Sequence, residues 1–291
     1  MNLLVTGANG QLGSEMRVIS QGRTDHSWFF TDVQELDITD RSAIEHFVCS
    51  HGIDAIVNCA AYTNVDRAEQ DEQTAYLLNA TAAENLAVVA HKAGAMLIHI
   101  STDYVFDGKS YIPYKETDTP CPQTAYGRTK LAGEQLVLAA CPEAVIIRTA
   151  WLYSSFGNNF VKTMLRLGRE RDTLSVVYDQ IGTPTYAADL ACAIMTIIDR
   201  KNSIQQSYTP TSHIYHFTDL GVCSWYDFTC EIHRMAGISC KVNPILSEQY
   251  PQPTPRPHYS VLDKQKIQSD FGIAIPHWTD SLARCLALLL Q

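Results

Sequence analysis

The first half of the chain alternates short apolar runs with longer stretches that are amphipathic or rich in alanine. The predicted strands are Asn2–Thr6, Ser27–Thr31, Ala55–Cys59, Met96–Ser101 and Ala144–Arg148. The predicted helices between them include Ser42–His51, Gln73–Ala93 and Tyr126–Ala140. Strand and helix at this spacing are typical of βαβ units with right-handed crossovers and a parallel sheet. Because short strand segments such as Ala55–Val57 are apolar throughout, we expect helices on both faces of that sheet.

The pattern changes beyond about residue 150. Asn159–Arg169 and Ala187–Asp199 are predicted helices, and a polar stretch follows around Arg200–Ser212. Tyr250–Pro257 contains four prolines, so it is predicted to be an extended loop. We therefore expect an α/β fold with a Rossmann-type, doubly wound parallel sheet and a smaller C-terminal substrate lobe. Residues 1–150 and about 173–235 are assigned to the dinucleotide-binding domain, and about 151–172 and 236–291 to the lobe.

Composition narrows the class of protein. The 291 residues are 46% hydrophobic and 18% charged, which is typical of a globular chain. No apolar run approaches the ~20 residues that span a bilayer, so we expect no membrane association. The chain starts with a strand pattern and not with a signal peptide. Nine scattered cysteines without a C-x-x-C pair indicate reduced thiols and a cytoplasmic protein.

The charge and the histidine pattern argue against nucleic-acid binding and against a catalytic metal. The net charge is −9 and no basic run is present, which argues against a nucleic-acid surface but allows a local cationic pocket for a phosphate. The ten histidines include no H-E-x-x-H pair, so no catalytic metal is expected.

A glycine-rich turn follows the first predicted strand. Gly7, Gly10 and Gly13 surround Gln11 and Leu12, where a helix is predicted to begin. Gly7 permits the tight turn, Gly10 lets the backbone approach a pyrophosphate, and Gly13 allows close packing of helix on strand. The helix start then offers free N–H groups to the phosphates. Glycine triplets also occur in ordinary turns, but this position in a βαβ series favours a dinucleotide site.

Residues after the second and third strands are predicted to contact the rest of the dinucleotide. A carboxylate at Asp32 commonly binds the adenosine ribose 2′-hydroxyl, which favours NAD over NADP; the alternative is a solvated loop acid. Asp37 and Ile38 are expected beside the adenine. Ala61, Tyr62 and Thr63 are expected on the nicotinamide side.

Tyr126 and Lys130 are four residues apart in a predicted helix, so both side chains face the same way. A lysine ammonium in that position lowers the pKa of the tyrosine and holds the nicotinamide ribose, while the tyrosine donates a proton to a carbonyl oxygen. An exposed helix pair is the alternative. Tyr111 and Lys115 share the spacing, but Pro113 lies between them and no helix aligns that pair.

The third catalytic group is expected where the fourth strand ends, because ligands bind at the carboxyl edge of a parallel sheet. Thr102 follows that strand and is predicted to donate a hydrogen bond to the substrate carbonyl oxygen. The alternative is a structural hydroxyl that ends the strand.

The G-x-x-G-x-x-G spacing is similar to that of the extended short-chain dehydrogenase/reductase superfamily, and further motifs narrow the resemblance. These motifs are Ser101–Phe106, Tyr126–Glu134, Arg148–Tyr153, Gly157–Phe160, Asp179–Thr185 and Thr254–Pro257. Together they resemble the dTDP-4-dehydrorhamnose reductase family over nearly the whole chain. That family uses NADPH or NADH to reduce the C4 keto group of dTDP-4-dehydro-L-rhamnose, giving dTDP-L-rhamnose for bacterial surface polysaccharide.

The resemblance implies roles for individual residues. Tyr126 would be the proton donor, Lys130 its electrostatic partner and Thr102 the hydroxyl that orients the substrate. The residues implied to contact the dTDP-sugar are Thr102, Asp103, Tyr104, Trp151, Asn159 and Arg256. Trp151 offers an apolar face to a deoxysugar methyl, and Arg256 is able to pair with a diphosphate. The alternative interpretations are that Trp151 is a core residue and that Arg256 is a surface residue.

One departure from the family concerns a metal. Some members dimerise through magnesium held by glutamates, and Glu15 fits one such position. The segment Ala187–Asp189 offers no glutamate where another is expected, so no metal is predicted and a homodimer is left open.

Other functions are also open. A related dTDP-6-deoxy-4-keto sugar, a 4,6-dehydratase or epimerase reaction, and a non-catalytic nucleotide-binding regulatory subunit are the alternatives. Dehydration requires a second acid after the threonine, and Asp103 is followed by Tyr104.

Overall fold

The computed structural model of the 291-residue chain describes residues 1–203, 213–250 and 252–291. Most of the polar stretch Arg200–Ser212, and position 251 of the predicted Tyr250–Pro257 loop, therefore lie outside the described residues. No helix within the described ranges combines the length and apolar character needed to cross a bilayer.

A six-stranded parallel sheet forms the larger part of the molecule, in the order β10-β5-β4-β3-β1-β2. Its strands are β1 (Asn2–Thr6), β2 (Ser27–Thr31), β3 (Ala55–Asn58), β4 (Met96–Thr102), β5 (Val145–Thr149) and β10 (Ile214–His216). From β1 the chain passes to β2 on one side and then returns to β3 on the other. This reversal places a topological switch point beside β1, at whose carboxyl end open sheets bind ligands.

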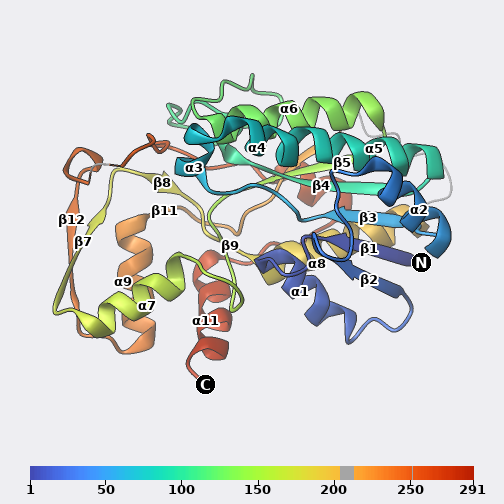
Figure 1. The fold of residues 1–291 in the computed structure, drawn as a ribbon. Helices are drawn as coiled ribbons and strands as arrows, with labels where there is room; N and C mark the ends of the chain where they lie inside the picture. The colour runs from blue at the N-terminus through green and yellow to red at the C-terminus, as the bar shows by residue number, and fades with distance from the viewer. Residues whose placement is uncertain (204–212, 251) are drawn as a thin grey trace.

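Helices cover both faces of the sheet, as the apolar strands predict (Figure 1). Side chains alternate along β1: Leu3 and Val5 belong to one core and Leu4 to the other. The helices packed on the first core are α1 (Gln11–Ser20), α8 (Ala187–Ser203) and α10 (Gln265–Phe271). Those on the second are α2 (Arg41–His51), α5 (Ala82–Ala93) and α6 (Ala125–Ala140). The expected doubly wound Rossmann fold is confirmed.

The connection before α5 differs from the single helix predicted over Gln73–Ala93. It comprises α3 (Val65–Gln70), α4 (Glu72–Tyr76) and the π-helical turn η1 (Leu77–Thr81). Asn79 in that turn is buried, and its amide exchanges two hydrogen bonds with the backbone of Tyr62. The π turn therefore serves a tertiary contact, as such turns often do near functional sites.

A smaller lobe packs around its own core. Its helices are α7 (Phe160–Glu170), α9 (Trp225–Ala236) and α11 (Trp278–Leu289). Its strands are β6 (Leu152–Tyr153), β7 (Thr173–Val177), β8 (Ile181–Gly182), β9 (Thr185–Tyr186), β11 (Cys223–Ser224) and β12 (Lys241–Ile245). Two short 3-10 turns, η2 (Asp103–Val105) and η3 (Ser247–Gln249), complete the elements.

The boundary between sheet and lobe differs from the one expected. Residues 173–235 were assigned to the dinucleotide-binding domain, but only α8 and β10 of that stretch pack on or pair within the large sheet. β7 pairs with β12, and α9 packs against α7 and α11. The chain therefore enters the lobe three times. The local sequence pattern does not predict this division, because an amphipathic helix such as α9 would bury its apolar face equally well against the large sheet or within the lobe.

Candidate active site

Two cavities lie at the carboxyl edge of the sheet and meet at the turn after β1. The larger has a volume of about 500 Å³, and the predicted site residues that line it are Gly7, Gly10, Gln11, Leu12, Gly13, Ala61, Thr63, Thr102, Asp103, Tyr104, Tyr126, Lys130 and Trp151. The smaller, of about 410 Å³, is lined by Gly7, Gly10, Asp32, Asp37, Ile38 and Ala61, among others. Both volumes suit parts of a dinucleotide.

The glycine turn has no room for side chains. Gly7 has φ +63°, and a Cβ there would lie 2.6 Å from the backbone nitrogen of Ala60. A Cβ on Gly13 would lie 2.5 Å from the Gly7 carbonyl oxygen. Gly10 precedes α1 and provides no side-chain cap, so the first turn of α1 presents its N–H groups to the cavity. This arrangement suits a diphosphate at a helix start.

Asp32 lies on the rim of the smaller cavity. Its Oδ2 accepts a hydrogen bond from the Asn9 N–H at 3.2 Å, and its Oδ1 accepts one from the Val33 N–H at 2.9 Å. These bonds hold the carboxylate beside the glycine turn, where a ribose hydroxyl donor would find it.

Helix α6 carries Tyr126 and Lys130 into the larger cavity. Its first turn is capped by the Thr124 hydroxyl, which accepts a hydrogen bond from the Gly127 N–H at 3.0 Å. Further along, a Cβ on Gly133 would lie 2.1 Å from the Asn79 carbonyl oxygen, so this close approach requires glycine. The helix is thereby held against both the end of β4 and the π turn.

Tyr126 is buried, and its ring packs edge-on against Tyr104, with the centroids 5.4 Å apart. Burial raises the pKa of Tyr126 to about 12; the Thr102 hydroxyl acts in the lowering direction and the Asp103 carboxyl in the raising one. The phenol therefore carries its proton throughout the physiological range.

Lys130 is almost fully buried, and its Nζ donates a hydrogen bond to the Ile100 carbonyl oxygen at 2.7 Å. Burial lowers the pKa of Lys130 to about 8, although Glu134 acts in the opposite direction. The expectation that Lys130 lowers the tyrosine pKa finds no direct contact in this structure, because the ammonium is hydrogen-bonded to Ile100.

A series of buried polar side chains, connected by hydrogen bonds, leads to Lys130. The Asn58 Oδ1 accepts hydrogen bonds from the Thr6 hydroxyl and the Ala60 N–H, so its Nδ2 is the group that donates to the Nδ1 of His99. Neutral His99 therefore carries its proton on Nε2, which lies 3.4 Å from the Lys130 Nζ. Burial holds the pKa of His99 well below its usual value. A ring N–H facing Lys130 disfavours the ammonium.

Thr102 ends β4, and its hydroxyl donates to the Asp103 Oδ1 at 2.9 Å while accepting from the Tyr104 N–H. These two bonds support the structural interpretation of this hydroxyl, whereas its hydrogen bond with Tyr126 and its place in the larger cavity support the catalytic one. Burial raises the pKa of Asp103 to about 7, and its Oδ2 is buried without a hydrogen-bond partner. Asp103 is among the residues that line the larger cavity, where a sugar hydroxyl would satisfy that oxygen.

Trp151 has the one positive φ among the non-glycine residues described, at +49°, an unfavourable conformation for an aromatic side chain. Its ring stacks on Trp225, with centroids 3.5 Å apart and planes 9° from parallel. A Cβ on Gly182 would lie 2.6 Å from the Trp151 ring. Strain held by surrounding contacts is typical of functional positions. Trp151 thus links the cavity to the lobe.

Two residues implied by the resemblance do not line the cavity. Asn159 caps α7, and its Nδ2 donates to Gln11 and to the Ser154 carbonyl oxygen; its neighbour Asn158 lines the cavity instead. Arg256 is paired with Asp66 at 2.8 Å. A diphosphate would have to displace that carboxylate, so the implied roles of both residues lack direct support here.

Other residues at the site were absent from the sequence interpretation. Cys59, Ile100, Thr149 and Asn158 line the larger cavity, while His99 and Trp225 contact residues that do. Asn79 bonds instead to Tyr62 and Thr129, neither of which lines either cavity. Position at the end of a strand was the available signal for Cys59 and Thr149. The supporting residues carry no local signal, since their partners are distant in sequence.

Glu15 is buried and accepts a hydrogen bond from the Ser154 hydroxyl, and burial raises its pKa. Asp189 is bonded to Arg284 and Ser281. Both acids considered for a magnesium site are therefore hydrogen-bonded to other residues of this chain.

A dinucleotide-shaped cleft with a tyrosine and a lysine on one helix face defines the class: an NAD(P)-dependent oxidoreductase of the extended short-chain dehydrogenase/reductase type. The family described as "RmlD substrate binding domain" matches residues 1–291. A dTDP-4-dehydrorhamnose reductase of Aggregatibacter actinomycetemcomitans is 41% identical over 96% of this chain and 96% of its own.

Solved structures agree. The dTDP-4-dehydrorhamnose reductase of Clostridium acetobutylicum superposes with a TM-score of 0.94 at 45% identity, covering 100% of both chains. The dTDP-4-dehydrorhamnose reductase of Bacillus anthracis, solved in complex with NADP, gives 0.91 at 39% identity over 98% of each chain. The chain belongs to the dTDP-4-dehydrorhamnose reductase family, which confirms the resemblance and the expected cofactor class, NADPH or NADH.

Proposed function

We propose that this protein reduces the C4 keto group of dTDP-4-dehydro-L-rhamnose with NADPH or NADH, forming dTDP-L-rhamnose. The observation that carries the proposal is the convergence of Tyr126, Lys130 and Thr102 in the cavity that also contains the glycine turn. Family membership over the full chain supports the choice of substrate.

When held at the glycine turn, NADPH or NADH would supply the hydride that reduces the carbonyl carbon of the sugar. Tyr126 donates its proton to the carbonyl oxygen, which suits a phenol that is protonated at neutral pH. Thr102, once its hydroxyl turns away from the Asp103 Oδ1, would donate a hydrogen bond to the same oxygen and orient it. Lys130 binds the ribose and favours the phenolate that remains after proton transfer.

The sugar is proposed to contact Asp103, Tyr104 and Trp151. The unpartnered Asp103 Oδ2 would accept a hydrogen bond from a sugar hydroxyl, and the Trp151 ring would contact the deoxysugar methyl. Arg256, once released from Asp66, would pair with the diphosphate. Asn159 is proposed to act indirectly, through its bond to Gln11 at the glycine turn.

The competing functions differ from the proposed one in the groups they require or in the product they form. A 4,6-dehydratase requires a second acid after the threonine, and Tyr104 occupies that position. A non-catalytic regulatory subunit would have no need to keep all three of Thr102, Tyr126 and Lys130. Reduction of a related dTDP-6-deoxy-4-keto sugar would give a product whose configuration differs from that of dTDP-L-rhamnose.

The test is the oxidation of NADH or NADPH with dTDP-4-dehydro-L-rhamnose, with product configuration determined by NMR. Tyr126→Phe should lower kcat by roughly 10²–10⁴-fold and leave dinucleotide affinity unchanged, because it removes one proton donor. Tyr111→Phe is the matched control, since Tyr111 is 88% exposed and should leave kcat unchanged. Near-normal turnover by Tyr126→Phe would contradict the assignment, and no net NAD(P)H oxidation would favour an epimerase.

A cytoplasmic location and a homodimer are also proposed. The absence of disulfides among the nine cysteines, all of them in described ranges, supports a cytoplasmic location. The homodimer left open by the resemblance is tested by light scattering.

A further inference from the structure

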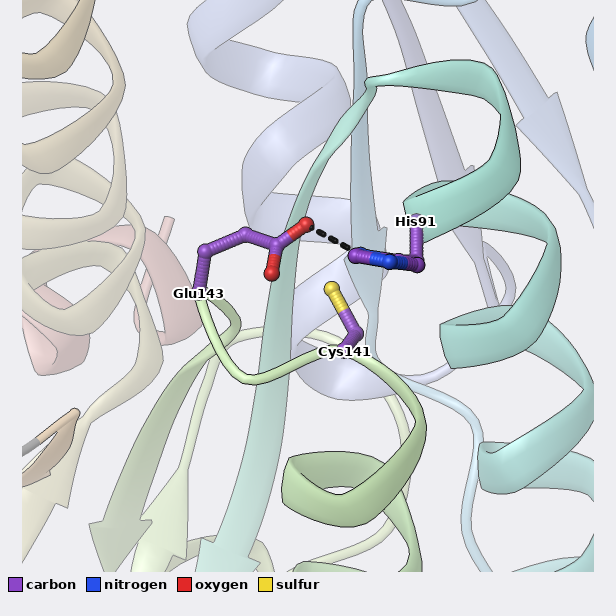
Figure 2. Close-up of side chains that lie close together, drawn as sticks. All are labelled: His91, Cys141 and Glu143. Atoms are coloured by element: carbon purple, nitrogen blue, oxygen red, sulfur yellow. Dashed lines mark hydrogen bonds and ion pairs between the residues drawn. The ribbon is translucent and has the colours of Figure 1, made fainter.

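Three side chains with metal-binding atoms converge at the edge of the sheet where the strands begin. His91 lies in the last turn of α5, Cys141 ends α6, and Glu143 lies two residues before β5 (Figure 2). Their ligand atoms all lie within 4.8 Å of one another, and the His91 Nδ1 is 2.7 Å from a Glu143 carboxylate oxygen. The three side chains point toward a common centre.

Tight turns hold the backbone on both sides of this cluster. The Ala144 N–H donates to the Cys141 carbonyl oxygen at 3.0 Å, closing a turn in which Pro142 is the second residue. At the end of α5, Gly94 is left-handed and its N–H bonds back to the helix. Cys141 is buried, so its side chain is held in place. His91 and Glu143 are exposed, so their side chains are free to adjust.

We infer that His91, Cys141 and Glu143 form a zinc site, with water as the fourth ligand. Nitrogen, sulfur and carboxylate oxygen are the ligands that zinc takes in tetrahedral sites. Binding deprotonates the Cys141 thiol and releases that proton to solvent, so thiolate and carboxylate balance the two positive charges.

The geometry requires small movements. Bonds of ~2.0 Å at tetrahedral angles separate nitrogen and oxygen ligands by roughly 3.3 Å. The contact between His91 and Glu143 must therefore open slightly while the sulfur approaches, and exposed side chains have that freedom.

The site lies away from the candidate active site. β4 separates the two edges of the sheet by seven residues, or roughly 20 Å of strand. Bound zinc would join the end of α5 to the turn between α6 and β5. It should stabilise the fold without changing turnover, so this inference is independent of the proposed function.

The experiment uses tag-free, chelator-treated protein. One equivalent of zinc should bind in equilibrium dialysis and raise Tm, and cobalt should give a thiolate charge-transfer band in the near ultraviolet. Cys141→Ser should abolish that band. His91→Asn and Glu143→Gln, at exposed positions that leave folding intact, should weaken zinc binding at least about tenfold, since even outer-shell partners contribute ~10–100-fold.

Cys49→Ser is the matched control, because Cys49 is an exposed cysteine on α2 and its loss should change nothing. A cobalt spectrum without the thiolate band would overturn the inference. Zinc affinity that is equal in the parent protein and the Glu143→Gln variant would overturn it as well. Turnover by the metal-free protein reports separately on the proposed function.

Discussion

Burial sets the ionisation of the residues around the larger cavity. It raises the pKa of Tyr126 to about 12 and that of Asp103 to about 7, and it lowers the pKa of Lys130 to about 8. Each group is therefore shifted toward its neutral form. Perturbed groups gathered in one cleft are typical of active sites.

The Lys130 shift predicts a pH dependence. Lys130 is charged below its pKa and neutral above it, so activity that needs the ammonium should fall as pH rises through about 8, and not through its usual 10.5. The measurement is kcat/KM for NAD(P)H oxidation between pH 6 and 10, with the fold checked by circular dichroism. Asp103→Asn should keep this decline, because it removes only the group that titrates near pH 7. A profile flat to pH 10 would contradict the prediction.

The Asp32 carboxylate predicts a change in cofactor use. Asp32→Ala should raise KM for NADH more than KM for NADPH, because it removes an acceptor for the ribose hydroxyl and a charge that repels the 2′-phosphate. Steady-state kinetics with both cofactors test this. Equal losses would place Asp32 outside the ribose contacts.

At the scale of elements, α6 is held to β5 by a buried ion pair. Arg148 donates to both oxygens of Glu134, at 2.8 and 2.6 Å, and both side chains are 2% exposed. Glu134 lies one turn beyond Lys130, and it also accepts from the Ser101 hydroxyl. The pair therefore fixes the helix that carries the candidate catalytic residues.

Glu134→Gln should lower the free energy of unfolding by about 3–5 kcal/mol, because it leaves the Arg148 charge buried without its partner. The matched control is Glu72→Gln, which breaks an exposed pair with Arg128 and should cost about 0–1 kcal/mol. Urea unfolding of both variants measures the difference. Similar losses would indicate that the buried pair stabilises no more than the exposed one.

The elements also show what local patterns miss. The five strands of the first half were predicted to within one residue at either end, because continuous apolar runs suit strands that are covered by helices on both faces. The stretch Gln73–Ala93 has continuous helical character, and nothing in its local pattern predicts the π turn. That turn follows from Asn79, whose contacts lie 17 and 50 residues away.

At the scale of the whole molecule, sheet and lobe meet at the candidate active site. Trp151 contacts Trp225 of the lobe, and Asn159 of α7 bonds to Gln11 of α1. A dinucleotide bound at the glycine turn would therefore stabilise both parts together.

NADPH at about 100 times its Kd should stabilise the protein by about 2.7 kcal/mol. Gly13→Ala should lose this stabilisation, because the new Cβ meets the Gly7 carbonyl oxygen at 2.5 Å. Gly22→Ala is the control, since its nearest contact would be an ordinary 3.8 Å. The measurement is the Tm of each protein with and without NADPH. If NADPH raised the Tm of Gly13→Ala as much as that of the parent protein, the cofactor would bind elsewhere.

The sequence by itself determined the parallel sheet, the glycine turn and the alignment of Tyr126 with Lys130, because each depends on the spacing of residues and elements along the chain. Only the tertiary structure decided which residues support them. His99 beneath Lys130, Trp225 against Trp151, and the convergence of His91 with Cys141 and Glu143 join elements 31 to 74 residues apart. Such contacts arise when helices and strands pack, and no local periodicity carries them.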